Sequence, residues 1–299
     1  MRIIHRISIS STPEIRDELA ALGIVVGARG LVTFEVDEAH EAWSALRPWI
    51  ARRRAADIVS TKFSERELAG APWLALEPNW HHGYPQPDEV RFGYREATYS
   101  VADFRERCGI GLKQKAPFQM KSETKWGRNG ILQLHWVFDE FFVRPEVWRT
   151  VFNPNGVGCR PVLDAKGAEL KTVVQLVLPE EMGVVVRGLV TERCARCGRV
   201  KFLPVTRGAF PPLESEPPVR MAKMREYFGS GALAHRGILV SREMAQALAR
   251  RRRCGEPRCD RSNGHGEKPR SCEARSARPA ISPCPRSSAP PPGRGGAPE

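Results

Sequence analysis

Hydrophobic residues in the first third of the chain recur at the spacing of β-strands. Residues 2–9 (RIIHRISI) place Ile3, Ile7 and Ile9 on one face, although Ile4 interrupts the strict alternation. Residues 30–36 (GLVTFEV) alternate in the same way. Both segments are therefore predicted to be strands of one sheet.

Helix signals follow each of these two strands. Ser11 or Thr12 can cap a helix that has Pro13 in its first turn. Asp37 is placed to cap a second helix. The order of strand, helix, strand, helix predicts a small α/β module over residues 1–70.

The middle of the chain has a less regular pattern. Residues 71–100 are rich in Trp, Pro and Gly and predict an irregular segment held by its aromatic rings. Residues 130–143 (GILQLHWVFDEFFV) are strongly apolar, and the spacing towards the DEFFV end favours a helix. Residues 219–227 also have a helical pattern.

Two β-rich runs stand close together later in the chain. Residues 171–178 (KTVVQLVL) and 183–190 (GVVVRGLV) are separated by a PEEMG turn, which predicts a hairpin. A short strand is expected before Ser241, which can cap a last helix. Together with the preceding segments, these runs predict a β-rich domain over residues 71–249, and the chain as a whole is expected to have an α+β fold.

Composition changes abruptly near residue 250. Residues 250–299 are dominated by Pro, Gly, Ser and Arg, so they cannot bury enough apolar surface to offset the entropy of ordering. We therefore predict a disordered tail. This tail holds 12 Lys or Arg against 5 Asp or Glu, so it carries +7 of the net charge of +13. The charge of the whole chain is thus weak evidence for nucleic-acid binding.

No secretory signal or membrane span is expected from the sequence. The N-terminal apolar run is short, and the longest apolar stretches fall well below the roughly 18 residues that a membrane helix needs. A cytoplasmic protein is the expectation, without a membrane partner. The eight cysteines would then be free thiols or metal ligands, because the cytosol keeps thiols reduced.

The cysteine pattern carries the most specific chemistry. Cys194 and Cys197 form a C-x-x-C-G motif, and a tight knuckle of this kind supplies two of the four ligands of a zinc ion. Upstream, RERCG at 105–109 has the same pattern with Arg105 in place of the first cysteine and Cys108 as the second. The chain therefore holds one intact knuckle and one degenerate knuckle.

This arrangement resembles the double-CXXCG-motif family of bacterial proteins, which is known mainly from myxobacteria. The resemblance covers roughly residues 75–249 and includes the C-terminal stretch EYFGSGALAHRGILVSREMAQAL. It implies zinc as the cofactor, with Cys108, Cys194 and Cys197 as metal ligands. Some members are immunity proteins that neutralise a cognate toxin, so the resemblance implies a cognate protein toxin as the partner.

The degenerate knuckle leaves three outcomes open for the metal. A fourth ligand can be recruited from elsewhere, with His81 or His82 as the nearest candidate. Three thiolates and a water molecule can bind zinc weakly. Alternatively, Arg105 marks a site that has lost its metal and is held by packing alone, because a guanidinium cannot ligate zinc.

Two further patterns lead to different functions. Residues 113–128 interleave five basic side chains with Phe118 and Trp126, a combination that can bind single-stranded nucleic acid. His135, Asp139 and Glu140 would share a helical face and could form a divalent-metal site in an enzyme. No nucleophile with a base and no nucleotide-binding loop accompanies them.

The leading prediction is a non-enzymatic binding protein of the immunity type. The first alternative is a zinc-ribbon-like protein that binds nucleic acid, and the second is a metal-dependent enzyme. The sequence does not indicate the oligomeric state.

Overall fold

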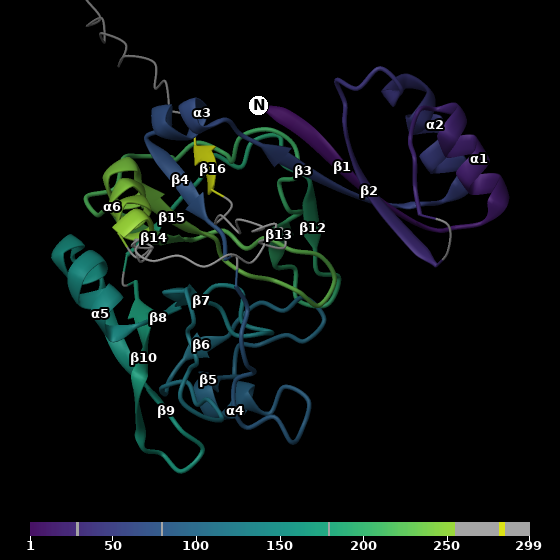
Figure 1. Ribbon diagram of the computed structural model, residues 1–299. Coiled ribbons are helices and arrows are strands. Elements are labelled where there is room, and N and C mark those ends of the chain that lie inside the picture. The colour runs from purple at the N-terminus through teal and green to yellow at the C-terminus, as the bar shows by residue number, and fades with distance from the viewer. Residues whose placement is uncertain (28–29, 79, 179, 255–280, 285–299) are drawn as a thin grey trace, which may run out of the picture. The chain divides into compact units, whose positions relative to one another are not determined.

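The chain folds into two compact units with an α+β content of short helices and several small sheets. The computed structural model describes residues 1–27, 30–78, 80–178, 180–254 and 281–284 (Figure 1). The first unit comprises Met1–Gly70 together with Val205–Phe210, and the second comprises the rest of the chain. The α+β class predicted from the sequence is confirmed.

The first unit is built on a three-stranded antiparallel sheet. Strand β1 (Arg2–Ser10) lies in the centre, between β2 (Leu31–Asp37) and β3 (Ala56–Lys62). The first two strands were predicted from their alternation. The third was not, because none of the residues of β3 is buried, so it offers no apolar face to read.

Three helices accompany this sheet: α1 (Pro13–Ala21), α2 (Trp43–Arg53) and α3 (Glu65–Gly70). The predicted cap of α1 is confirmed, because the hydroxyl of Thr12 accepts a hydrogen bond from the amide of Ile15. The predicted cap of α2 is wrong. The carboxylate of Asp37 instead accepts from the amide of Ala39, which closes a turn, and the helix begins only at Trp43.

The core of this unit forms where α1 and α2 meet one face of the sheet. Buried Ile7, Leu19 and Trp49 belong to one hydrophobic cluster. The returning segment Val205–Phe210 joins the unit through polar contacts. The amide of Gly208 donates to the hydroxyl of Thr61 (2.9 Å), and that hydroxyl donates to the carbonyl of residue 206 (3.0 Å).

The second unit contains a five-stranded sheet in the order β11–β14–β15–β4–β16. These strands are Glu181–Met182, Met221–Met224, Ile238–Ser241, Trp73–Leu76 and Ile281–Cys284 respectively (Figure 1). All four residues of β14, β15 and β4 are buried, as expected for central strands. The helix predicted over residues 219–227 is therefore wrong, because the sequence MAKM lies inside a sheet.

A four-stranded sheet of the second unit has the order β7–β8–β10–β9. Its strands are Ile131–Leu132, Phe142–Val143, Glu169–Val177 and Gly158–Leu163. The predicted hairpin after residue 178 is wrong, since β10 pairs with β9 and β8 instead. The turn that decides this pairing lies at Asp164, whose carboxylate accepts from the amides of Lys166 and Ala168, while Gly167 adopts a φ of +85°.

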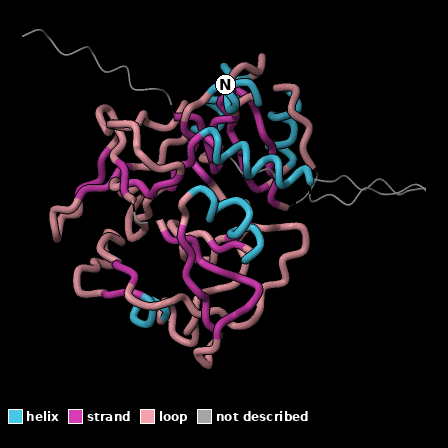
Figure 2. Tube along the Cα trace, turned by 90° about the vertical axis from the view of Figure 1, so that its left-hand side faces the viewer, coloured by secondary structure: helices cyan, strands magenta, loops and turns pink. Residues whose placement is uncertain are grey.

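Short elements and loops make up much of the remainder (Figure 2). Two small antiparallel pairs are β5 (Tyr99–Ser100) with β6 (Lys113–Gln114), and β12 (Thr191–Arg193) with β13 (Val200–Phe202). Helix α4 (Tyr94–Thr98) precedes β5. Helix α5 (Pro145–Val147) continues into a π-helical turn (Trp148–Phe152) and a 3-10 turn (Asn153–Asn155).

The last helix is α6 (Arg242–Cys254). Its predicted start is confirmed, because the hydroxyl of Ser241 accepts from the amide of Met244. The predicted tail lies largely outside the described residues; within it, α6 runs to Cys254 and β16 pairs with β4.

Candidate metal centre

The intact knuckle lies in the turn between β12 and β13, as the sequence predicted. The amide of Cys194 donates to the carbonyl of Arg199, and the amide of Gly198 donates back to the carbonyl of Cys194, both at 2.9 Å. Gly198 adopts a φ of +72°, a conformation that favours glycine. These contacts form a closed turn that carries Cys194 and Cys197 at its two ends.

The degenerate knuckle has the same backbone. The amide of Arg105 donates to the carbonyl of Ile110 (3.0 Å), and the amide of Gly109 donates back to the carbonyl of Arg105 (2.8 Å). Gly109 has a φ of +75°. Each bond matches one in the intact knuckle, so Arg105 occupies the backbone position that Cys194 has there, and Cys108 corresponds to Cys197.

The fold brings the three remaining cysteines together. The sulfur atoms of Cys108, Cys194 and Cys197 all lie within 4.8 Å of one another, and those of Cys108 and Cys197 are 3.9 Å apart. Thiolates on a tetrahedral zinc ion stand about 3.8 Å apart, since each Zn–S bond is about 2.3 Å long. The sulfur spacing therefore suits three corners of a metal tetrahedron, and this group can hold a metal ion.

The fourth corner is not supplied by Arg105. Its side chain is exposed and its Nη1 atom donates to the carbonyls of Phe104 (3.0 Å) and Ala102 (3.3 Å). Among the described residues, the metal-binding group includes neither His81 nor His82. The ring of His81 instead lies 5.9 Å from that of His135.

Hydrogen bonds from the backbone favour the ionised, metal-binding form of the Cys194 thiol. The backbone amides of Cys197 and Arg196 point at the sulfur of Cys194 and lower its pKa to about 7. Burial has the opposite effect on Cys108 and raises the pKa of its thiol. Cys194 therefore has a thiol that ionises near neutral pH, whereas the thiol of Cys108 ionises less readily.

A buried lysine braces the knuckles, and no motif in the sequence pointed to it. Lys201 on β13 is only 1% exposed. Its ammonium group donates to the carbonyls of Cys108 (3.2 Å) and Leu233 (3.0 Å), and it forms an ion pair with Glu192 (3.3 Å). It also donates to the carbonyl of Gly231. Lys201 thus joins the degenerate knuckle, the β12–β13 hairpin and the loop at 231–233.

The second candidate metal site is not assembled. The helix predicted towards the DEFFV end of residues 130–143 does not form, because Trp136 adopts a φ of +69° and a strand, β8, follows. The half-buried carboxylate of Glu140 pairs with Lys223, and that of Asp139 lies 3.9 Å from Arg236. The ring of His135 stacks on Tyr84, and no described metal-binding group contains these three residues.

The basic segment separates its charges from its rings. All five cationic side chains between residues 113 and 128 are exposed. Phe118 is fully buried in the core, and Trp126 is 6% exposed with its indole nitrogen donating to the carbonyl of Thr172 (2.7 Å). Neither ring is available to stack on a base.

A comparison with protein-family models finds no match to this chain, and a comparison with curated proteins finds none either. Among the described helices, none has both the length and the apolar character required to cross a membrane.

Proposed function

We propose that the three-cysteine group binds one zinc ion that stabilises the scaffold of the second unit. The support comes from the two matched knuckles and from sulfur atoms at the spacing of zinc thiolates. Two of the three cysteines are buried, and the sulfurs pack with Ile110, Tyr227 and Ala234, which suits a structural site. Three thiolates would hold the ion, with water at the corner that faces Arg105.

Metal analysis of the protein purified under reducing conditions tests this proposal. We expect close to one zinc per chain, lost in Cys197→Ser together with part of the thermal stability. Cys159→Ser is the matched control, because this half-buried cysteine lies outside the group and should leave the zinc content unchanged. Zinc-free protein with an unchanged melting temperature after zinc addition would exclude the site.

We further propose that the protein acts by binding rather than by catalysis, as an immunity-type protein that neutralises a cognate toxin. This proposal is supported by the resemblance of the RERCG and CARCG motifs to the double-CXXCG family, and the two motifs share one backbone turn in this chain. The carboxylates of the enzyme alternative are engaged in ion pairs, so that alternative loses its motif-based support.

Co-expression tests the immunity proposal. A toxin-like protein encoded beside this one should arrest bacterial growth, and this protein should restore growth and co-purify with it. If growth is arrested equally with and without this protein, the proposal fails. Cys197→Ser serves to show whether rescue depends on the metal scaffold.

Nucleic-acid binding remains the second candidate because five cations of the basic segment are exposed. Replacing four of them, Lys115, Lys121, Lys125 and Arg128, by Glu should abolish any salt-sensitive binding to single-stranded DNA or RNA. Binding that survives this change would have to come from elsewhere, such as the basic residues after position 250.

A further inference from the structure

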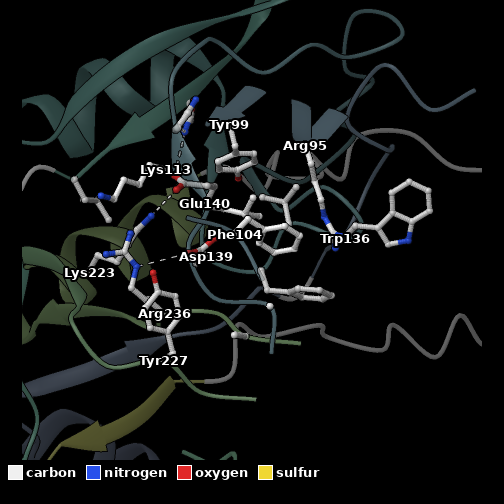
Figure 3. Close-up of a pocket in the computed structure, with 18 of the residues that line it drawn as sticks. Arg95, Tyr99, Phe104, Lys113, Trp136, Asp139, Glu140, Lys223, Tyr227 and Arg236 are labelled. Atoms are coloured by element: carbon white, nitrogen blue, oxygen red, sulfur yellow. Dashed lines mark hydrogen bonds and ion pairs between the residues drawn. The ribbon is translucent and has the colours of Figure 1, made fainter. Parts of the chain in front are cut away.

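The second unit contains a cavity of about 600 Å³, partly open to solvent, that the sequence did not suggest. Its walls come from several separate parts of the chain: residues within 94–114, 136–140, residue 160, residues 175–178 and 181, and residues within 223–227 and 232–236 (Figure 3). The volume lies within the range of about 300–1,000 Å³ that is usual for small-molecule sites.

Charged side chains are unusually frequent in this cavity. Three carboxylates face it, from Asp139, Glu140 and Glu181. Six cations line it as well: Arg95, Lys113, Arg160, Lys223, Arg225 and Arg236. A cation can bind a ligand anion only if no carboxylate of the chain already pairs with it.

Two of the six cations pair with carboxylates of the cavity itself. Lys223 pairs with Glu140, and Arg236 pairs with Asp139 and Glu181. The Arg236 and Asp139 side chains are drawn together in Figure 3. All three carboxylates that line the cavity are therefore engaged in ion pairs.

Two more cations pair with carboxylates outside the lining. Lys113 lies 3.4 Å from Asp103, and Arg225 lies 2.7 Å from Glu214. Among the described residues, Arg95 and Arg160 have no carboxylate partner. The cavity therefore presents two uncompensated guanidinium groups.

Arg95 is held in place for a ligand. Its guanidinium carbon lies 4.0 Å from the ring centroid of Phe92 and 5.0 Å from that of Phe104. Aromatic rings fix a guanidinium group without occupying its N–H donors. The Nε atom of Arg95 is buried and closed off from solvent, so the guanidinium group would bind a ligand through its terminal nitrogens.

Arg160 lies beside a polar part of the cavity wall, formed by Gln175 and its hydrogen-bond partners. On β9 it lies opposite Gln175 of β10, a side chain that is 1% exposed. Gln175 donates to Gln114 (2.7 Å) and to Glu140 (3.0 Å), so its donors are already used. Among the described residues, the guanidinium group of Arg160 has no hydrogen-bond or ion-pair partner, so its donors are open to a ligand.

Aromatic rings offer surface for the body of a ligand. Phe104, Trp136 and Tyr227 line the cavity and are each only partly buried. In the view of Figure 3, Arg95 and Trp136 lie at one end of the drawn residues, and Lys223 and Arg236 lie at the other. A ligand with both an anionic group and an apolar or flat body would use both kinds of surface.

We propose that this cavity binds a small organic anion carrying two negative charges, such as a phosphate monoester or a dicarboxylate. Arg95 and Arg160 supply the charge-assisted hydrogen bonds, and the partly buried rings contact the body of the ligand. None of the three proposed zinc ligands lines this cavity, and the proposal does not rest on a toxin partner.

Calorimetric titration of the full-length protein under reducing conditions tests the inference. The probes are AMP, a phosphate monoester with a flat ring, and phthalate, an aromatic dicarboxylate. Adenosine, which carries no negative charge, and benzoate, which carries one, serve as the control probes. We expect saturable one-site binding of AMP or phthalate, and binding of the matching control at least about tenfold weaker. The stronger of the two dianions identifies the ligand class.

Variants connect the binding to the two arginines. Arg95→Gln and Arg160→Gln should each weaken binding about tenfold or more, while Arg149→Gln, an exposed arginine outside the cavity, should leave it unchanged. Arg95→Lys and Arg160→Lys keep the charge and should bind with intermediate affinity, which guards against a variant that misfolds. The inference is overturned if neither dianion binds below about 10 mM. It is equally overturned if both glutamine variants bind like the wild type.

Discussion

The two knuckles each end in a glycine with the same backbone conformation, but the two glycines have different surroundings. Gly109 and Gly198 both have a φ near +75°. A Cβ atom at Gly198 would meet nothing within 4 Å, whereas one at Gly109 would lie 2.8 Å from the amide of Ala234 and still closer to the carbonyl of Ala232. Both neighbours are backbone atoms, so they cannot move aside cheaply.

We therefore expect Gly109→Ala to destabilise the protein far more than Gly198→Ala. The left-handed conformation alone costs a residue with a Cβ about 1–2 kcal/mol, which is the expected effect at Gly198. The steric conflict should raise the loss at Gly109 to about 2–5 kcal/mol. Urea unfolding in the presence of a chelator measures both without a contribution from metal. Equal losses would contradict the close packing of the degenerate knuckle against the loop at 232–234.

Arg105 offers a test of the matched knuckles. Because its backbone occupies the position of Cys194, Arg105→Cys should place a fourth thiol at the open corner of the group. Four-thiolate sites are the usual form of structural zinc, so the affinity for zinc should rise at least about tenfold. Competition against a chromophoric chelator measures the change.

Arg107→Cys is the matched control for this gain, since Arg107 is exposed in the same turn at a position that does not correspond to a ligand. If both variants bind zinc equally well, the added thiol acts without specific geometry, and the correspondence between the knuckles is wrong.

At the residue level, the sequence indicated the cysteine cluster but not its surroundings. The spacing of CARCG and RERCG was sufficient to associate Cys108 with Cys194 and Cys197, because a repeated local motif predicts a repeated local turn. Lys201 could not be found in this way. Its role depends on carbonyl groups supplied by the loop at 231–233, and no sequence pattern shows where such groups point.

At the level of elements, local signals predicted well where one residue settles the structure. Thr12 and Ser241 were recognised as helix caps because a cap is decided by a few neighbouring residues. The pairing of β10 depended on the Asp164 turn, a weaker signal than the PEEMG turn that follows the strand. Met221–Met224 was read as helical because burial on both faces of a central strand removes the alternation that identifies strands.

The two main helices of the first unit are joined by a carboxylate that makes their packing sensitive to pH. Glu18 on α1 accepts hydrogen bonds from the indole of Trp49 (2.6 Å) and from Arg53 (2.9 Å), both on α2. The hydrogen bonds from Arg53 and Trp49 lower the pKa of Glu18 to about 2. A lowered carboxyl pKa contributes stability that is present above the unfolded value, about 4.3, and is lost as the pH falls towards 2.

Glu18→Gln should therefore destabilise the first unit at pH 7, and the difference from the wild type should shrink between pH 4 and pH 2. The indole N–H signal of Trp49, followed by NMR during urea unfolding, reports on this unit alone. Asp17→Asn on the same helix is the control, because Asp17 is exposed. A wild-type and variant difference that stays constant down to pH 2 would show that the carboxylate charge is not what joins the helices.

At the level of the whole molecule, little in the sequence indicates which distant segments meet. Val205–Phe210 belongs to the first unit although about 135 residues separate it from Gly70, and contacts such as that of Gly208 with Thr61 have no local signature. The cavity is a second example of distant segments that meet without a local sequence signal. Arg95 and Arg160 line the same cavity only because α4 and β9 face the same space.

The cavity and the metal centre share a wall, which couples the two proposed sites. Tyr227 and Ala234 pack against the cysteine cluster and also line the cavity, and Gly109, which directly follows Cys108, lines it as well. Lys201 holds the carbonyls of Cys108 and Leu233 on this side. Metal bound by the cysteines would therefore fix the position of one cavity wall before a ligand arrives.

Removal of the metal should weaken binding of the dianion in the cavity. Coupling between sites typically changes affinity about fivefold or more, so we expect at least that loss for the better of AMP and phthalate after chelation. Calorimetry with and without added zinc measures it, and linkage requires the dianion to tighten zinc by the same factor. Chelation should have no effect in Cys197→Ser, which lacks the site. Equal dianion affinities in zinc-loaded and zinc-free protein would mean that the shared wall is already rigid without metal and that the two sites act independently.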